Sequence, residues 1–314
     1  MLVIGWGFVG AALGHRLASD GADVVSLTRS ETAATGRARA AGIRIIVADA
    51  SEPPALADAL PGVDHVVVAA GGLLPPSAAA EPLEDAKATL SPLIRTLEET
   101  RRHAGVTVTY ISSGGTVYGN PVRTPVRETD ETLPVSPYGA SHLAAEAYAG
   151  MYRRTYGMPV RIVRCANVYG PGQPNDRNQG VIAVFLERIS TGAPITVLGN
   201  GSMKRDYVFV DDVSEALAQL ILEGVDLDVV NVGSGRGSSV ADVVECVSRV
   251  VGRPAILEFQ PVRPYDVDAI VLDVSKLQSL IPYMPTSLED GLQKTWDARD
   301  VGCSTIDAIA SRSS

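Results

Sequence analysis

The chain has 314 residues, of which 46% are hydrophobic, and this is enough apolar material to bury one large core or two unequal ones. A formal charge of −9 argues against non-specific binding of nucleic acid, and no apolar run reaches the roughly 18 residues that a membrane span needs. Three widely spaced cysteines show neither metal-ligand spacing nor a disulfide framework. We therefore expect a cytoplasmic globular protein with no metal, and with neither nucleic acid nor a membrane as partner.

The first half of the chain alternates short β-branched runs with Ala- and Leu-rich stretches. The runs LVIG, DVVSLTR, IRIIVAD and DHVVVAAGG predict buried strands, and the stretches between them predict helices. A longer helix is expected at 83–103, followed by the strand VTVTYISS, a helix that begins near Tyr138 and the strand VRIVRCANV. This order predicts the α/β class, a doubly wound parallel sheet of the Rossmann type with helices on both faces.

The composition changes near residue 166, where Gly, Pro and Asn begin to interrupt the chain. We expect 1–165 to form a dinucleotide-binding domain, and 166–314 to form a smaller α/β substrate-binding region partly interleaved with it. A helix is predicted at 181–191. A second glycine cluster, NVGSGRG at 231–237, also lies between a strand and a helix. Too little chain follows it to complete another nucleotide domain, so we interpret it as a turn.

A glycine-rich turn follows the first expected strand, in the sequence VIGWGFVGAAL. Gly5 allows a tight turn, Gly7 lets the backbone approach a pyrophosphate, and Gly10 permits close packing of helix on strand. The free N–H groups at the start of the helix then face the phosphates. The turn therefore predicts a site for NAD or NADP, and the further contacts expected there are Phe8, Val9, Ala69 and Ala70.

The end of the second strand distinguishes the two dinucleotides, because an acidic residue there binds the adenosine ribose of NAD. Thr28 stands about where this carboxylate belongs, and the neighbouring Arg29 could pair with the 2′-phosphate of NADP. Arg29 could equally be a solvated loop charge, so the sequence favours NADP but leaves NAD open. Asp49, at the end of the third strand, is expected to contact the adenine.

Six segments follow one another along the chain: GWGFVG, YISSGGTVYG, SPYGASH, RCANVYGPGQ, KRDYVFVDDV and RPYDV. In this order they resemble the extended short-chain dehydrogenase/reductase family, specifically its nucleotide-sugar epimerases and dehydratases such as UDP-glucose 4-epimerase. The resemblance spans nearly the whole chain. It implies hydride transfer between a sugar carbon and the nicotinamide, a nucleotide diphosphate sugar as partner, and a homodimer built from the helix at 83–103 and the Tyr138 helix.

The resemblance implies that Tyr138 is the acid/base of this reaction. The family has a lysine four residues later, whose charge favours the phenolate, and His142 stands there in this chain. An imidazole is mostly neutral at pH 7, because its ordinary pKa is about 6.5. Three interpretations stay open: His142 relays protons to Tyr138, it is a weak substitute while the oxidised nicotinamide supplies most of the field, or the site has lost redox chemistry. The second is favoured.

A second departure concerns the family's catalytic Ser or Thr, whose place is taken by Gly114. The neighbouring hydroxyls of Ser113 and Thr116 could replace it, or they could simply cap the loop. A third position, where the family often has an asparagine in the long helix, corresponds to Asp85.

The substrate side matches the family more closely. By resemblance, three residues contact the substrate diphosphate and one reaches the nucleotide ribose: Asn167, Arg205 and Arg263, and Asp266. The leading hypothesis is an NAD(P)-dependent nucleotide-sugar 4-epimerase that works through a keto-sugar. The alternatives are an NADPH-dependent keto-sugar reductase, a dehydratase, or a catalytically degenerate member that only binds its ligands.

Overall fold

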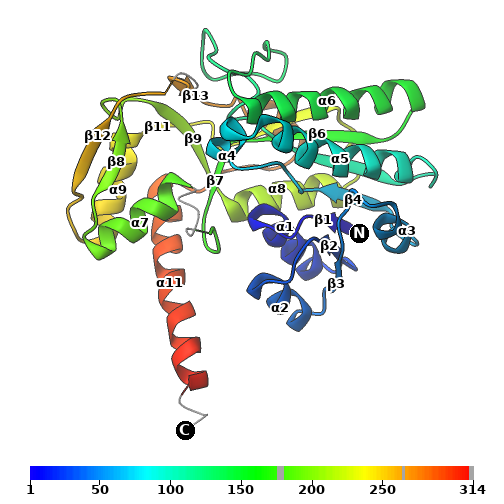
Figure 1. Cartoon of the computed structure of the whole chain (residues 1–314), viewed down its shortest axis with the longest axis horizontal. Coiled ribbons are helices and arrows are strands. Elements are labelled where there is room, and N and C mark those ends of the chain that lie inside the picture. The colour runs from blue at the N-terminus through cyan, green and yellow to red at the C-terminus, as the bar shows by residue number, and fades with distance from the viewer. Residues whose placement is uncertain (175–179, 264–265, 311–314) are drawn as a thin grey trace.

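The computed structural model describes residues 1–174, 180–263 and 266–310. Its centre is a seven-stranded sheet in the order β10-β6-β5-β4-β1-β2-β3, and every neighbouring pair in it is parallel (Figure 1). The strands are β1 (Leu2–Ile4), β2 (Val25–Thr28), β3 (Arg44–Val47), β4 (His65–Val68), β5 (Thr107–Ser113), β6 (Val160–Cys165) and β10 (Val229–Val232). The doubly wound parallel sheet expected from the sequence is confirmed.

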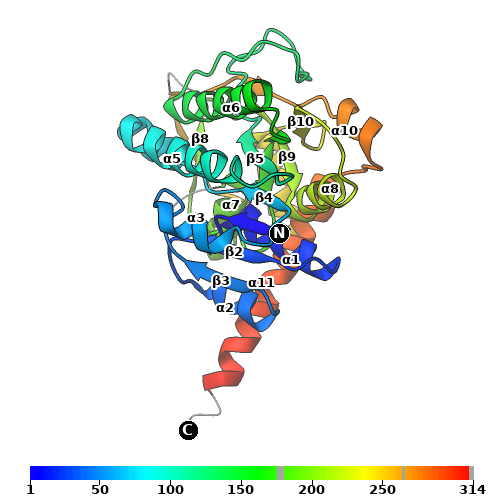
Figure 2. The same ribbon diagram turned by 90° about the vertical axis from the view of Figure 1, so that its right-hand side faces the viewer.

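Helices cover both faces of this sheet (Figure 2). One face carries α1 (Phe8–Ser19), α2 (Ala33–Ala40) and α8 (Val210–Leu222), and the other carries α3 (Pro53–Ala59), α5 (Pro82–Thr100) and α6 (Pro137–Tyr156). The short helix α4 (Pro75–Ala80) packs beside α5 and α6. The central strands are covered on both sides for this reason: all four residues of β4 and all six of β6 are buried.

Two expected helices can be compared with the structure. The helix predicted at 181–191 is α7 (Val181–Thr191), and Gly192 follows it with a φ of 75°, a left-handed conformation that ends helices. The helix predicted at 83–103 is α5, which ends at Thr100. It ends earlier than expected because the chain turns there, and Gly105, with a φ of 84°, leads it into β5.

The remaining elements form a smaller lobe beside the main sheet. It holds a sheet of β7 (Asn167–Tyr169), β9 (Lys204–Phe209), β11 (Gly237–Ser239) and β13 (Ala269–Ile270), a pair formed by β8 (Ile195–Leu198) and β12 (Leu257–Gln260), and the helices α7, α9 (Val240–Val251) and α11 (Leu288–Ala310). The short helix α10 (Ser275–Leu280) packs instead against β10 of the main sheet. The chain crosses between the two parts, because β10 pairs with β6 in the main sheet. Pro264 and Tyr265 of the RPYDV motif lie outside the described residues.

The second glycine cluster forms a turn between β10 and β11, as the sequence predicted. The turn is held by the buried carboxylate of Asp206, which accepts hydrogen bonds from the backbone N–H groups of Ser234 and Gly235 at 2.8 and 3.1 Å. Among the described residues, no helix is both long and apolar enough to cross a membrane.

Candidate active site

A cleft of about 1490 Å³ opens at the carboxyl edge of the main sheet. The strand order reverses between β1 and β4, and open α/β sheets bind ligands at such a reversal. Gly5 follows β1 there, and Ala69 and Ala70 follow β4. All three residues line the cleft.

The glycines of the first turn fit a dinucleotide. A methyl group on Gly10 would lie 2.0 Å from the carbonyl oxygen of Gly5, and one on Gly5 would lie 2.6 Å from the backbone nitrogen of Ala70. Gly7, in contrast, has nothing within 4 Å of that position, so a ligand can approach its backbone. Gly7 caps α1 without a side-chain hydrogen bond, which leaves the first N–H groups of the helix available to a phosphate.

The structure brings most of the predicted cofactor residues together. Those that line the cleft are Gly5, Gly7, Phe8, Thr28, Arg29, Asp49, Ala69 and Ala70. Gly10 instead packs against the backbone of Gly5, and Val9 packs against the apolar core around α1. Tyr138 and His142 lie beside the cleft and are not among the residues that line it. The ring of His142 lies 3.8 Å from where a methyl group on Gly71 would be, and Gly71 lines the cleft.

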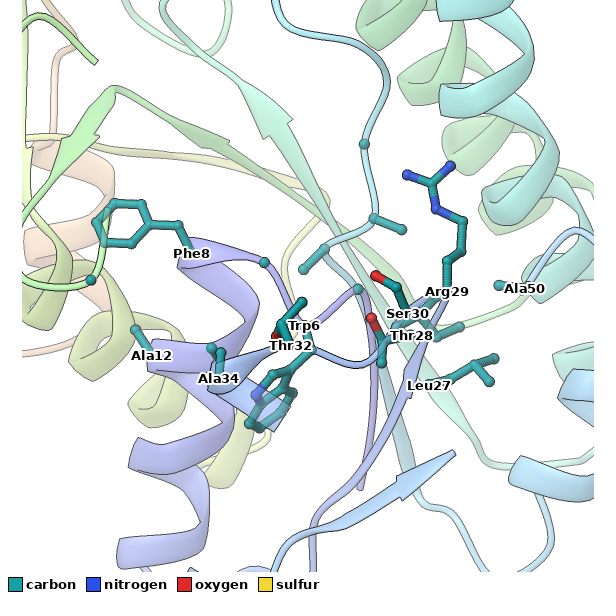
Figure 3. Close-up of a pocket in the computed structure, with 18 of the residues that line it drawn as sticks. Trp6, Phe8, Ala12, Leu27, Thr28, Arg29, Ser30, Thr32, Ala34 and Ala50 are labelled. Carbon is teal, nitrogen blue, oxygen red and sulfur yellow. The ribbon is translucent and has the colours of Figure 1, made fainter. Parts of the chain in front are cut away.

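Several cleft residues were not predicted, among them the polar Ser30, Thr32 and Arg37. Figure 3 shows Thr28, Arg29 and Ser30 side by side at the end of β2, on the side of the cleft opposite Phe8. Within the described part of the chain, Arg29 and Arg37 form no ion pair with a carboxylate, whereas Arg39 is 2.6 Å from Glu31. The two arginines of α2 are visible in the sequence as possible phosphate ligands, but which of them faces the cleft depends on how the helix packs in the fold.

Tyr138 lies in the first turn of α6. Ser136 caps this helix, because its hydroxyl accepts a hydrogen bond from the N–H of Gly139 at 3.2 Å, and Pro137 starts the first turn. The rings of Tyr138 and His142 lie one helical turn apart, with centroids separated by 4.5 Å and planes tilted by 57°. The spacing expected from the sequence therefore does place both rings on one face.

The phenol of Tyr138 is shielded from water, and this burial raises its pKa to about 12. The negative charge of Asp85 acts in the same direction, and a hydrogen bond with the Ser113 side chain acts against it. Of the two hydroxyls proposed from the sequence, Ser113 is thus the one that interacts with Tyr138. The Thr116 hydroxyl donates to the carbonyl oxygen of Ser113 at 3.3 Å, which is a loop contact.

The packing around Gly114 accounts for the absence of a hydroxyl-bearing side chain at this position. A methyl group at this position would lie 2.7 Å from Cδ1 of Leu272 and 3.1 Å from the carbonyl oxygen of Arg164. Loop packing therefore leaves little room for a serine at Gly114, and the hydroxyl that serves Tyr138 comes from the residue before it.

His142 is almost fully buried, and this burial lowers its pKa to about 4. Asp85 acts in the opposite direction but does not offset the burial. The imidazole is neutral at pH 7, so it does not supply the positive charge that a lysine brings to this position. Its Nδ1 lies 2.7 Å from the hydroxyl of Tyr110, and its Nε2 has no hydrogen-bond partner among the described residues.

A buried ion pair fixes the position of α6 relative to the sheet. Arg164 on β6 contacts both carboxylate oxygens of Glu146, and its Nη2 lies 2.6 Å from Oε2. The hydroxyl of Ser112 on β5 donates to the same carboxylate at 2.6 Å. Glu146 is one turn beyond His142, so its contacts with Arg164 and Ser112 hold the helix that carries Tyr138 against β6 and against β5, the strand that carries Ser113.

The substrate residues expected from the resemblance lie in the smaller lobe. The amide oxygen of Asn167 on β7 is 2.8 Å from where a methyl group on Gly115 would be, so Asn167 faces the catalytic loop. Arg263 forms an ion pair with Asp266 at 2.8 Å. Arg205 on β9 is close enough for both of these charges to act on it, while burial lowers its pKa. The structure therefore gathers Arg205, Arg263 and Asp266 into one charged cluster.

Comparisons with known proteins show the family to which this chain belongs. Residues 1–233 match the model of the NAD dependent epimerase/dehydratase family. The UDP-glucose 4-epimerase of Mycolicibacterium smegmatis is 33% identical over 301 residues, which are 92% of this chain and 94% of that protein. The dTDP-4-dehydro-6-deoxy-D-allose reductase of Streptomyces bikiniensis is 29% identical, with 92% of each chain covered.

Solved structures show the same fold. The UDP-glucose 4-epimerase of Thermotoga maritima, solved with UDP-glucose, superimposes with a TM-score of 0.89 at 29% identity, over 96% of this chain and 99% of that one. The UDP-glucose 4-epimerase of Thermus thermophilus, solved with NAD, gives 0.85 at 29% identity, over 95% and 98%. The resemblance found in the six sequence motifs is confirmed, and the chain is an enzyme of the NAD-dependent epimerase/dehydratase family.

Proposed function

We propose that this enzyme is a 4-epimerase of a nucleotide diphosphate sugar. The observation that carries the proposal is the position of Tyr138 in the first turn of α6, where its ring lies against that of His142 beside the dinucleotide cleft and the Ser113 side chain is near enough to act on the pKa of its phenol. The charged cluster of Arg205 and Arg263 supplies guanidinium groups that suit a diphosphate.

The chain's own residues then have distinct tasks. The glycine turn and the start of α1 hold the pyrophosphate, and a bound nicotinamide supplies reversible hydride uptake. Tyr138 removes the proton of the sugar 4-hydroxyl as the C4 hydride leaves, and it returns the proton when hydride comes back to the other face of the keto-sugar. Ser113 hydrogen bonds the same phenol and orients it. Asn167, Arg205 and Arg263 keep the nucleotide diphosphate in place while the sugar turns over.

We further propose that the dinucleotide is NADP rather than NAD. Thr28 ends β2 without a carboxylate, and Arg29 and Arg37 face the cleft with no acidic partner among the described residues. Guanidinium groups beside hydroxyls suit the 2′-phosphate of NADP.

Binding of the two dinucleotides by calorimetry tests this preference. Arg29→Ala is expected to weaken NADP⁺ binding by about tenfold or more while leaving NAD⁺ binding nearly unchanged, because one charge-assisted contact is lost. Arg39→Ala is the matched control, since Arg39 is paired with Glu31 outside the cleft. Equal loss of both dinucleotides in Arg29→Ala, or tighter binding of NAD⁺ by the wild type, contradicts the proposal.

A keto-sugar reductase is the second candidate, and the arginines of the cleft favour it because reductases draw on NADPH. Proton NMR of a panel of UDP-, dTDP- and GDP-sugars, with and without added dinucleotide, separates the two. An epimerase converts the sugar without net change in cofactor, whereas a reductase consumes one NADPH for each turnover. If these ligands stabilise the protein but none of them is converted, both the epimerase and the reductase proposals are wrong and the protein only binds its ligands.

We also propose a homodimer formed through α5 and α6. These helices pack against each other and expose three large apolar side chains, Leu83, Tyr148 and Tyr156. Light scattering after size exclusion measures the mass directly. A monomer at micromolar concentration contradicts the proposal, and replacement of Leu83 and Tyr148 by aspartate is expected to dissociate a dimer.

A further inference from the structure

The hydrogen bond between Tyr110 and His142 has no part in the proposed function. Tyr110 is on β5, three residues before Ser113, and it is fully buried. Its hydroxyl is 2.7 Å from Nδ1 of His142, and this is the one hydrogen bond that it makes with the described residues.

The hydrogen in this bond comes from the phenol. A buried O–H group needs an acceptor, and Nδ1 is the acceptor within reach of Tyr110. If Nδ1 carried the hydrogen instead, the phenol hydrogen would be left without a partner in the core. Nδ1 therefore accepts, and the ring hydrogen of the neutral imidazole is on Nε2.

We infer that Tyr110 is a positioning residue for His142: it fixes the imidazole as the neutral Nε2–H tautomer and directs that N–H toward the rim of the dinucleotide cleft. The tautomer is a property of this chain alone. Its effect on catalysis rests on the proposed function.

The direction of Nε2 follows from its surroundings. Nε2 is buried without a hydrogen-bond partner among the described residues, and it lies 3.9 Å from where a methyl group on Gly71 would be. Gly71 is exposed and lines the cleft. A side chain at Gly71 would cover the ring, so glycine leaves this edge of His142 close to the ligand. An uncharged N–H there suits a hydroxyl or carbonyl oxygen of a bound nicotinamide riboside.

The charged and titratable groups around the ring act against each other. Asp85 on α5 favours the imidazolium form of His142, whereas burial disfavours it. The ring of Tyr138 lies 4.5 Å from that of His142, and Glu146, one turn further along α6, is already paired with Arg164. Tyr110 opposes Asp85, because protonation of Nδ1 would displace its O–H from the one acceptor it has. Tyr110 thus keeps a donor, and not a cation, beside Tyr138.

Nitrogen NMR of the full chain with ¹⁵N-labelled histidine tests the tautomer directly. The sequence has four histidines, and His142→Gln identifies the signal of His142 by its loss. At neutral pH the wild type is expected to show a protonated Nε2 and an acceptor-type Nδ1. Tyr110→Phe, which removes only the hydroxyl, is expected to mix the two tautomers. An Nδ1–H tautomer or an imidazolium in the wild type overturns the inference, and so does an unchanged tautomer in Tyr110→Phe.

Dinucleotide affinity supplies the second readout. Tyr110→Phe is expected to weaken binding by about two- to tenfold, which is the range for one hydrogen bond. The same change in a His142→Gln background is expected to have no further effect, because Tyr110 acts through His142. Tyr152→Phe is the matched control, since Tyr152 is buried on α6 and its hydroxyl bonds to Glu98. An equal loss in both backgrounds means that Tyr110 only supports the fold.

These two readouts need no nucleotide sugar. If the tautomer is found but no sugar is converted, the proposed function fails and the inference stands. If sugar is converted by a protein whose His142 is cationic, the inference fails and the proposed function stands.

Discussion

Gly114 and His142 are two positions at which the sequence of this site departs from the family pattern that it resembles. The Ser113 side chain acts to lower the pKa of the Tyr138 phenol, whereas Leu272 and the β6 backbone fill the space where a side chain at Gly114 would lie. His142 is neutral and bonds to Tyr110, so it leaves the phenol with a raised pKa. Without a dinucleotide, Tyr138 is therefore a poor base at neutral pH, and the positive nicotinamide ring is the charge left to favour its phenolate.

Replacement of Tyr138 by phenylalanine removes only the hydroxyl that acts as acid/base and leaves the rest of the ring unchanged. Tyr138→Phe is expected to lower turnover by about 100- to 10,000-fold, the usual contribution of such a group, without weakening dinucleotide binding. Tyr152→Phe, further along the same helix, should retain turnover. Steady-state kinetics and calorimetry on both variants check this, and a fully active Tyr138→Phe removes Tyr138 from the mechanism.

A lysine at position 142 restores the charge that the family has there. A fixed cation near Tyr138 lowers the pKa of the phenol, so the rising limb of the activity profile should move to lower pH in His142→Lys. We expect activity at pH 7 to rise accordingly. The pH dependence of kcat/KM measures this, and an identical profile in variant and wild type means that position 142 does not tune the phenol.

The loop between β1 and α1 is the element that makes the dinucleotide site. The glycines of this loop and of the first turn of α1 have different surroundings: Gly10, in α1, lies against the Gly5 carbonyl oxygen, whereas Gly7 faces open space. The sequence motif predicted the tasks of both, because the spacing of the glycines reflects backbone constraints that act within a few residues.

Alanine at these glycines should separate binding from folding. Gly7→Ala is expected to unfold like the wild type but to bind dinucleotide at least about tenfold more weakly, because its methyl group occupies the path of the pyrophosphate. Gly10→Ala should be destabilised by about 1–3 kcal/mol through overpacking. Gly36→Ala, in an open position on α2, is the control for both. Thermal unfolding and calorimetry read the two effects, and intact binding in Gly7→Ala would be the contrary result.

Contacts between elements could not be predicted in the same way. The strands, the helices and the pairing of Tyr138 with His142 on one helical face follow from local periodicity. The bond between Tyr110 and His142 joins residues 32 positions apart, and it exists only because β5 lies directly against α6. The choice of Ser113 over Thr116, and of Arg37 over Arg39 at the cleft, likewise depends on how a loop or helix is seated on the sheet.

Two buried histidines make the stability of the whole molecule depend on pH. Burial lowers the pKa of His65 to about 3 and that of His142 to about 4 in the folded state, while both return to about 6.5 on unfolding. The unfolded chain therefore binds more protons below pH 6.5, and the stability that is complete above this pH is lost as the pH falls. Each histidine contributes about 1.4 kcal/mol per pH unit between pH 6 and pH 5.

Denaturant unfolding at several pH values tests this sign. His65→Gln should reduce the slope between pH 6 and pH 5 by about 1.4 kcal/mol per unit, although the lost contact with Thr109 lowers its stability at pH 7. His103→Gln, at an exposed position, is the control. A slope that does not change in His65→Gln shows that His65 is protonated equally in both states.

In the proposed function the two lobes hold a dinucleotide and a sugar nucleotide on opposite sides of Tyr138, and hydride passes between them. The most direct measurement is the fate of deuterium at C4 of whichever nucleotide sugar the enzyme converts, followed by NMR in ordinary water. If hydride passes between them, the epimerised product keeps its deuterium at C4 with no net change in cofactor. Loss of the label to water, or conversion that proceeds equally well without bound dinucleotide, would contradict it.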